Sequence, residues 1–190
     1  MEYMEEFVVG FDRTTLRPTL DLAKAKARLA ELGEGRSMTT VLERARLHAA
    51  CGELDLAASL AASAVVQART SGLRVEALEA RLVRASVAEA RGQSTEAIRE
   101  ASAIIEESRR GDFVEQWARA LQLRGIAHFE LEQWAEAVED FDRALALRRD
   151  AEAPQHLVDE SEISLLVAND RLAHEHPTVR RRRAVHPLFG

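Results

Sequence analysis

Two histidines near the C-terminus, His174 and His176, have the spacing in this chain that comes closest to a pair of metal ligands. Zinc sites use three or four protein ligands, and the sequence offers no evident third ligand for this pair. Pro177 follows directly, so the two side chains do not form a helical pair. We therefore expect no metal site here.

The usual motifs of catalysis and cofactor binding are not found in the sequence either. No paired glycines precede a helix in a phosphate-binding pattern, and no serine lies in a nucleophile-elbow motif. Cys51 is the only cysteine, and no base lies near it in the sequence to lower the pKa of its thiol. We expect no catalytic residues, no cofactor and no enzyme activity, with Cys51 serving in packing.

Four consecutive arginines, Arg180, Arg181, Arg182 and Arg183, are the strongest charge cluster. Such a cluster can contact the phosphates of nucleic acid, but it has no interleaved aromatic residues and does not lie on a basic helix. The formal net charge of the whole chain is −6, which disfavours general attraction to nucleic acid. A solvated tail is the favoured interpretation, and contact with nucleic acid or with the acidic N-terminus remains an alternative.

The composition predicts an all-α protein. Hydrophobic residues make up 46% of the chain with only 9 Gly and 4 Pro, and the abundant Ala, Leu, Glu and Arg favour helix. No apolar run approaches the roughly 20 residues of a membrane span, and the acidic start of the chain is unlike a secretory signal. A single cysteine gives no reason to expect an oxidising compartment. We expect a cytoplasmic protein that does not contact a membrane.

Alanine-centred segments recur at a constant interval along the chain. Ala57, Ala97 and Ala137 occupy the same place in three copies, since 97 − 57 = 40 and 137 − 97 = 40. Gly52 and Gly92 break the helical pattern within the first two copies and predict turns there. The three copies predict helical hairpins at residues 38–77, 78–117 and 118–153.

Glu132 stands in the third copy where the other two have glycine. The third turn must therefore avoid a left-handed backbone or tolerate some strain. Two capping-box pairs, Thr40 with Glu43 and Asp112 with Glu115, predict the starts of the first and third hairpins.

Helices are also predicted on both sides of the repeats. Thr19 can cap a leading helix with Asp21 in its first turn, and Gly33 can end it. Pro154 suits the first turn of a closing helix over residues 154–173. The predicted segments are a start of uncertain structure at 1–17, a helical domain at 18–173 and a basic tail at 174–190.

The third copy resembles a tetratricopeptide repeat. Gly125 matches the small residue midway along the first helix, Ala137 and Ala144 match the small residues at the helix crossing, and Trp134 and Phe141 supply the bulky residues. The interval between copies is longer than the roughly 34 residues of the standard repeat, as in longer repeats of bacterial regulators. The positions expected to pack the repeats together are Ala57, Ala97, Gly125, Ala137, Phe141 and Ala144.

This resemblance implies a right-handed α-solenoid with a C-terminal capping helix, whose first helices line a concave binding wall. The residues that it places on that wall are Arg46, Glu79, Ser86, Glu89, Arg119, Gln122, Ile126 and Phe129. A protein or peptide ligand would be held by Phe129 and Ile126 with Arg46 and Arg119 as anchors. The alternative for these residues is a solvated face without a ligand.

The resemblance implies a non-catalytic adaptor or scaffold. The competing function is a regulatory protein whose solenoid senses a ligand while its arginine tail contacts nucleic acid. Self-assembly into a homo-oligomer is a third possibility. His48 and His128 also share one repeat position, for which we favour a role in packing over a shared site.

Overall fold

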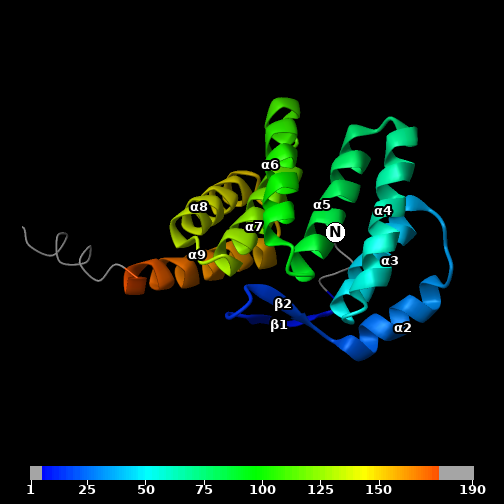
Figure 1. Ribbon diagram of the computed structural model, residues 1–190, viewed down its shortest axis with the longest axis horizontal. Helices are drawn as coiled ribbons and strands as arrows, with labels where there is room; N and C mark the ends of the chain where they lie inside the picture. Colours follow the sequence, from blue (N-terminus) through cyan, green and yellow to red (C-terminus); the bar gives the residue numbers. More distant parts are fainter. Residues whose placement is uncertain (1–5, 176–190) are drawn as a thin grey trace, which may run out of the picture.

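The computed structural model describes residues 6–175, and these are mostly helical (Figure 1). A two-stranded antiparallel sheet comes first, with β1 at Val8–Asp12 and β2 at Arg17–Leu20. The helices that follow are α2 (Leu22–Leu32), α3 (Met38–Ala50), α4 (Leu54–Ser71), α5 (Arg74–Ala90), α6 (Ser94–Gly111), α7 (Val114–Glu130), α8 (Trp134–Asp150) and α9 (Gln155–Glu175). Within this part of the chain, no helix is both long and apolar enough to cross a lipid bilayer.

The constant interval of the sequence repeat appears directly in the helix starts. The helices α4, α6 and α8 begin at Leu54, Ser94 and Trp134, and α5 and α7 begin at Arg74 and Val114. The second and third hairpins therefore start four residues before the predicted 78 and 118. The reason is that α3 has 13 residues whereas α5 and α7 have 17. Adding 40 to the first residue of α3 therefore gives a position four residues after the true start of α5, and the same holds for α7.

Every turn from α3 to α9 contains a residue in the left-handed region of backbone space. Gly52 and Gly92 take this conformation at the predicted turns, with φ of 80° and 75°. Glu132 takes it too, with φ of 58°, so the third turn accepts a strained backbone. The other such residues in these turns are Gly72, Asp112 and Glu152.

Glu132→Gly is expected to raise the free energy of unfolding by up to about 1 kcal/mol. The left-handed conformation costs a side-chain-bearing residue about 1–2 kcal/mol, and the greater freedom of glycine in the unfolded chain offsets part of that gain. The same change at Glu136, which is exposed in the first turn of α8, should lower stability instead. Urea unfolding of both variants measures the difference, and equal losses would contradict the prediction.

The N-terminal part of the chain differs most from the all-α prediction. Thr19 lies in β2 and does not cap a helix, whereas Asp21 caps α2 by accepting hydrogen bonds from the backbone N–H groups of Ala23 (3.0 Å) and Lys24 (3.1 Å). The predicted end of this helix at Gly33 is confirmed. The segment at 1–17, whose structure the sequence left uncertain, contains β1 and the first residue of β2.

Both predicted capping boxes are wrong. Ser37 caps α3 and accepts a hydrogen bond from Thr40 N at 3.2 Å, so Thr40 lies inside the helix. Asp112 follows α6 as its left-handed C-cap, and the residue before α7, Phe113, provides no side-chain cap. The predicted closing helix is present as α9. It begins at Gln155, directly after Pro154, and ends at Glu175.

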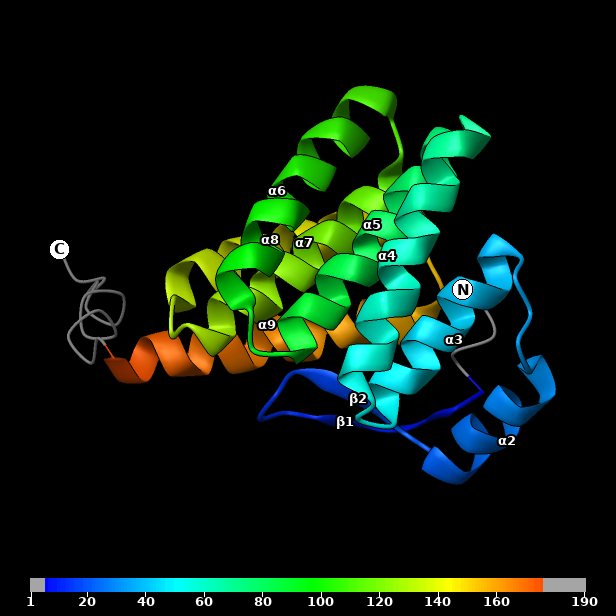
Figure 2. The ribbon, with the colours of Figure 1, turned by 45° about the vertical axis from the view of Figure 1, so that its right-hand side comes forward.

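Each helix from α2 to α9 packs against the next one along the chain (Figure 2). The first helices of the hairpins also contact one another, α3 with α5 and α5 with α7. Among the described helices, the second ones, α4, α6 and α8, make at most marginal contacts across hairpins. The two sets of helices therefore form layers, and the first helices lie closer together than the second.

The small residues expected at the helix crossings are all buried. Ala57, Ala97, Ala137 and Ala144 have no exposed surface. A Cβ atom built on Gly125 would lie 2.6 Å from Cε1 of Phe141, which is itself fully buried. Only glycine allows the aromatic ring to approach the backbone of α7 this closely.

Candidate functional site

The residues expected on a concave wall lie on α3, α5 and α7, but the structure divides them among three environments. Arg46, Glu79 and Arg119 form a charged cluster that joins the three helices. Glu89, Ile126 and Phe129 lie beneath the N-terminal hairpin, and Gln122 lies beneath α9. Ser86 is exposed and belongs to none of these sets.

The charged cluster is centred on the carboxylate of Glu79 in α5. Arg46 of α3 lies 3.1 Å from Glu79 Oε2, Gln116 of α7 donates to Oε1 at 3.1 Å, and Arg119 of α7 donates to the same oxygen. The side chains of Glu79 and the two arginines keep between 14% and 21% of their surface exposed, so solvent still reaches them. One carboxylate thus links all three hairpins through charge.

The pKa of Glu79 reflects two opposing effects. Burial raises it, but the charges of Arg119 and Arg46, with hydrogen bonds from Arg119 and Gln116, lower it overall below its usual 4.5. The ionised form is therefore favoured by folding, and its contribution to stability is present above the unfolded pKa.

Glu79→Gln is expected to destabilise the protein near neutral pH and to lose that effect in acid. The stability that Glu79 contributes is lost as the pH falls through its lowered pKa, so the difference in melting temperature between variant and wild type should narrow as the pH falls below about 4.5. Thermal melts from neutral to acidic pH measure this difference in stability between Glu79→Gln and wild type. Glu136→Gln, at an exposed position, should show little difference at any pH; a gap for Glu79→Gln that stays constant would contradict the assignment.

The amide of Gln122 is used within the fold. It accepts a hydrogen bond from the hydroxyl of Ser161 (2.8 Å) and donates one to the hydroxyl of Ser164 (2.9 Å), both on α9. All three side chains are buried. Gln122 therefore attaches the closing helix to α7, and α9 covers its side chain.

Ile126 and Phe129 are 7% and 5% exposed, so they do not form the open apolar contact that the sequence predicted. They belong to one buried cluster with Leu16, which is fully buried and precedes β2. The ring of Phe129 also packs edge-on against Trp134, with centroids 4.8 Å apart. The apolar pair is present on α7, but the hairpin of β1 and β2 packs against it through Leu16.

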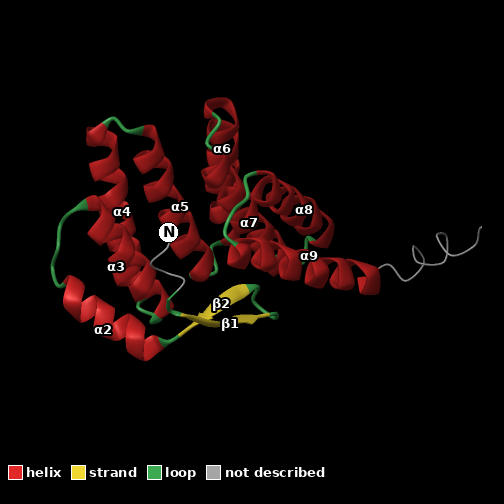
Figure 3. Cartoon of the chain, turned by 180° about the vertical axis from the view of Figure 1, so that it is seen from behind, coloured by secondary structure: helices red, strands yellow, loops and turns green. Residues whose placement is uncertain are grey.

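Arg17, the residue after Leu16, is bound by two carboxylates. Its guanidinium donates to both oxygens of Glu89, at the end of α5, and lies 3.4 Å from Glu130 of α7. Glu89 is 4% exposed, and burial raises its pKa above the usual 4.5, opposed by Arg17 and reinforced by Glu130. Figure 3 shows the hairpin beside the end of α5 and next to α7 and α9.

Sequence reasoning missed Leu16 and Arg17. Leu16 has φ of 54°, in the left-handed region, at a cost of about 1–2 kcal/mol for a residue with a side chain. No pattern in the neighbouring residues predicts this backbone conformation. The burial of Leu16 could not be predicted either, because the residues that it packs against lie in distant helices. The Thr-Thr-Leu-Arg segment at the start of β2 gave no indication of a contact with α7.

The histidines and the cysteine have local roles. His48 Nδ1 lies 2.5 Å from a carboxylate oxygen of Glu53, and His128 Nδ1 lies 2.6 Å from the amide oxygen of Gln133, so both tie the end of a first helix to the start of the second. Burial raises the pKa of the Cys51 thiol, which disfavours the reactive thiolate. Residues 6–175 contain no cluster of metal-ligating side chains, while His176 and Arg180 to Arg183 lie outside the described residues.

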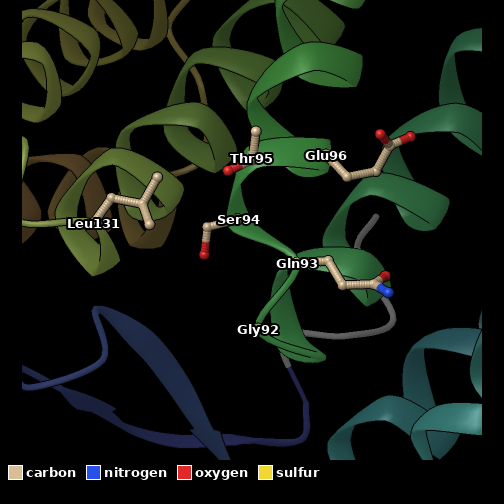
Figure 4. Close-up of a pocket in the computed structure, with 6 residues that line it drawn as sticks. All are labelled: Gly92, Gln93, Ser94, Thr95, Glu96 and Leu131. Atoms are coloured by element: carbon tan, nitrogen blue, oxygen red, sulfur yellow. The ribbon is translucent and has the colours of Figure 1, made fainter.

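An open hollow of about 490 Å³ lies between two hairpin turns (Figure 4). Its lining is Gly92, Gln93, Ser94, Thr95, Glu96 and Leu131. In Figure 4, Leu131 lies across from Ser94 and Thr95, and the side chain of Glu96 points away from Leu131. Glu96 is bound by Arg99, so the hollow presents no free acid or base to a ligand.

No protein-family model matches the chain, and a search of curated proteins found no significant match. The geometry of the first-helix layer and of the hairpin contact is therefore the basis for any functional assignment.

Proposed function

We propose that this protein is a non-catalytic scaffold that binds a protein or peptide, built as a right-handed α-solenoid of three tetratricopeptide-like hairpins. The observation that carries the proposal is the asymmetry between the two helix layers. The first helices contact their counterparts in neighbouring hairpins, whereas the second helices barely do. Such packing curves a stack of hairpins and places α3, α5 and α7 on its inner, concave side.

The chemistry of the first-helix layer supports recognition of a charged segment. Arg46, Glu79 and Arg119 keep partial access to solvent on three successive hairpins. A carboxylate of a ligand would compete with Glu79 for either arginine, and a basic group of a ligand would compete for Glu79. A surface of this kind selects partners by charge pattern, and it favours a segment that carries both signs.

The proposal is tested by capturing a partner on the immobilised full chain from a lysate of the cells that make it. The concave variant carries Arg46→Gln and Arg119→Gln. A matched control carries Arg99→Gln and Arg110→Gln on α6, where the side chains are 71% and 76% exposed. Both variants change the net charge equally, and circular dichroism verifies that each keeps its helices.

A partner that wild type and control retain should be depleted about tenfold or more on the concave variant, which is the loss of a central contact. Equal retention by all three proteins, or no protein retained above bare resin, would reject the concave face as the binding surface.

A further inference from the structure

The N-terminal hairpin makes a contact that resembles a bound peptide more than a structural strand. Of residues 8–20, Leu16 is the only one that is fully buried, Phe11 is partly buried against the same cluster, and most of the others are exposed. The hairpin base is held separately, because Phe7 packs with Ala25 and Leu47 and its carbonyl accepts a hydrogen bond from Asp21 N at 2.8 Å. The base of the hairpin is therefore held by contacts with α2 and α3 that do not involve α7.

The surface beneath the tip has the composition of a recognition socket. Ile126 and Phe129 of α7 and Ala168 of α9 belong to the same buried cluster as the side chain of Leu16. Glu89 stands beside them with 4% of its surface exposed, and among the described residues Arg17 is the only cation paired with it. If the tip left, the carboxylate of Glu89 would lose the counter-charge of Arg17, and the apolar pair beside it would be uncovered.

We propose that this socket docks a segment of a partner protein in which a large aliphatic residue is followed directly by arginine, and that Leu16 and Arg17 occupy it until that partner competes. The apolar cluster around Leu16 favours an aliphatic side chain of similar shape. Glu89 and Glu130 favour an arginine beside it, because a guanidinium can donate two parallel hydrogen bonds to a carboxylate. The strained backbone of Leu16 weakens the internal occupant relative to a segment that carries the same two side chains without strain. The socket thereby refines the proposed concave-face function, on which it rests.

The test uses purified full-length protein and a synthetic probe, a fluorescein-labelled peptide with the sequence of residues 6–21. The tip variant carries Leu16→Gly and Arg17→Ser, which removes the two side chains that occupy the socket and gives the left-handed position a residue suited to it. Fluorescence anisotropy should show that the probe binds the tip variant at least about tenfold more tightly than wild type, where the competent state is rare.

Specificity is tested in the tip-variant background. Changing the arginine of the probe that corresponds to Arg17 to glutamate, or Glu89→Gln in the protein, should each weaken binding about tenfold, whereas Glu136→Gln on the exposed face of α8 should leave it unchanged. If the tip variant loses helical signal, Arg17→Gln alone replaces it, with a gain of about threefold expected because the leucine remains seated.

A folded tip variant that binds the probe no more tightly than wild type, or that binds the charge-reversed probe equally well, overturns the proposal. So does sedimentation of wild type as a dimer and of the tip variant as a monomer, which would assign the socket to the hairpin of a second copy. Because the probe assay needs no natural partner, its failure leaves the capture experiment on the concave face intact, and the two proposals fail separately.

Discussion

Phe141→Ala is expected to lower the free energy of unfolding by about 3–5 kcal/mol, which is the range for deleting a buried aromatic side chain. Phe141 has no exposed surface and lies in the cluster that joins α7, α8, α9 and the hairpin tip. Its ring lies against the backbone of α7 at Gly125, where no side chain is present to move into the space left behind. The cavity would therefore collapse poorly, and the loss should fall toward the upper part of the range.

Two controls isolate this effect. Leu166→Ala removes an apolar side chain that is 64% exposed on α9, and it should change stability by no more than about 0.5 kcal/mol. Phe141→Leu keeps most of the apolar volume and should cost clearly less than Phe141→Ala. Urea unfolding followed by circular dichroism gives all three values. A loss for Phe141→Ala no greater than that for Leu166→Ala would show that the third hairpin does not depend on this packing.

The features predicted from the sequence are those determined by local or repeating patterns. Gly52 and Gly92 indicate turns because their left-handed backbone is a property of a few neighbouring residues. Gly125 and Phe141 lie within one hairpin, on its first and second helices, so the resemblance to a known hairpin pairs them. The helical content and the constant interval between the copies follow from the same kind of evidence.

The hairpin contact could not be predicted in this way. Arg17 forms an ion pair with Glu89, which lies 72 residues further along the chain. Nothing in the sequence around Arg17 predicts which carboxylate it would contact. The predicted wall residues do lie on the first helices, yet whether a residue on that wall is open depends on what else in the chain covers it. Phe129 and Gln122 show this, because one lies under the hairpin and the other under α9.

Arg148→Met is expected to lower the free energy of unfolding by about 3 kcal/mol, because removing one partner of a buried ion pair leaves the remaining groups uncompensated. Arg148 is 4% exposed and donates to the carbonyl of Leu157 (2.5 Å) and the hydroxyl of Ser161 (2.8 Å), and it lies 3.0 Å from Glu160. These contacts attach α9 to α8. Burial lowers the pKa of Arg148 from its usual value, which shows that the buried position disfavours the charged form.

The neighbouring residue supplies the control. Arg149 is 59% exposed and pairs with Glu162, itself 44% exposed, so Arg149→Met should cost no more than about 1 kcal/mol. The two variants remove the same side chain from adjacent positions on one helix, and they differ in burial. Similar losses for both would mean that the ion pair between α8 and α9 contributes little to attaching the closing helix.

The double variant Arg148→Met with Glu160→Met distinguishes attraction from the penalty of an unpaired charge. The Nε atom of Arg148 has no hydrogen-bond acceptor among the described residues, so the arginine is imperfectly satisfied where it stands. Replacing both charges by apolar side chains removes that deficit together with the unpaired carboxylate, and such replacements are often neutral. We therefore expect the double variant to recover more than half of the stability that Arg148→Met loses. A double variant less stable than Arg148→Met would instead show that Glu160 stabilises the closing helix through contacts other than its ion pair with Arg148.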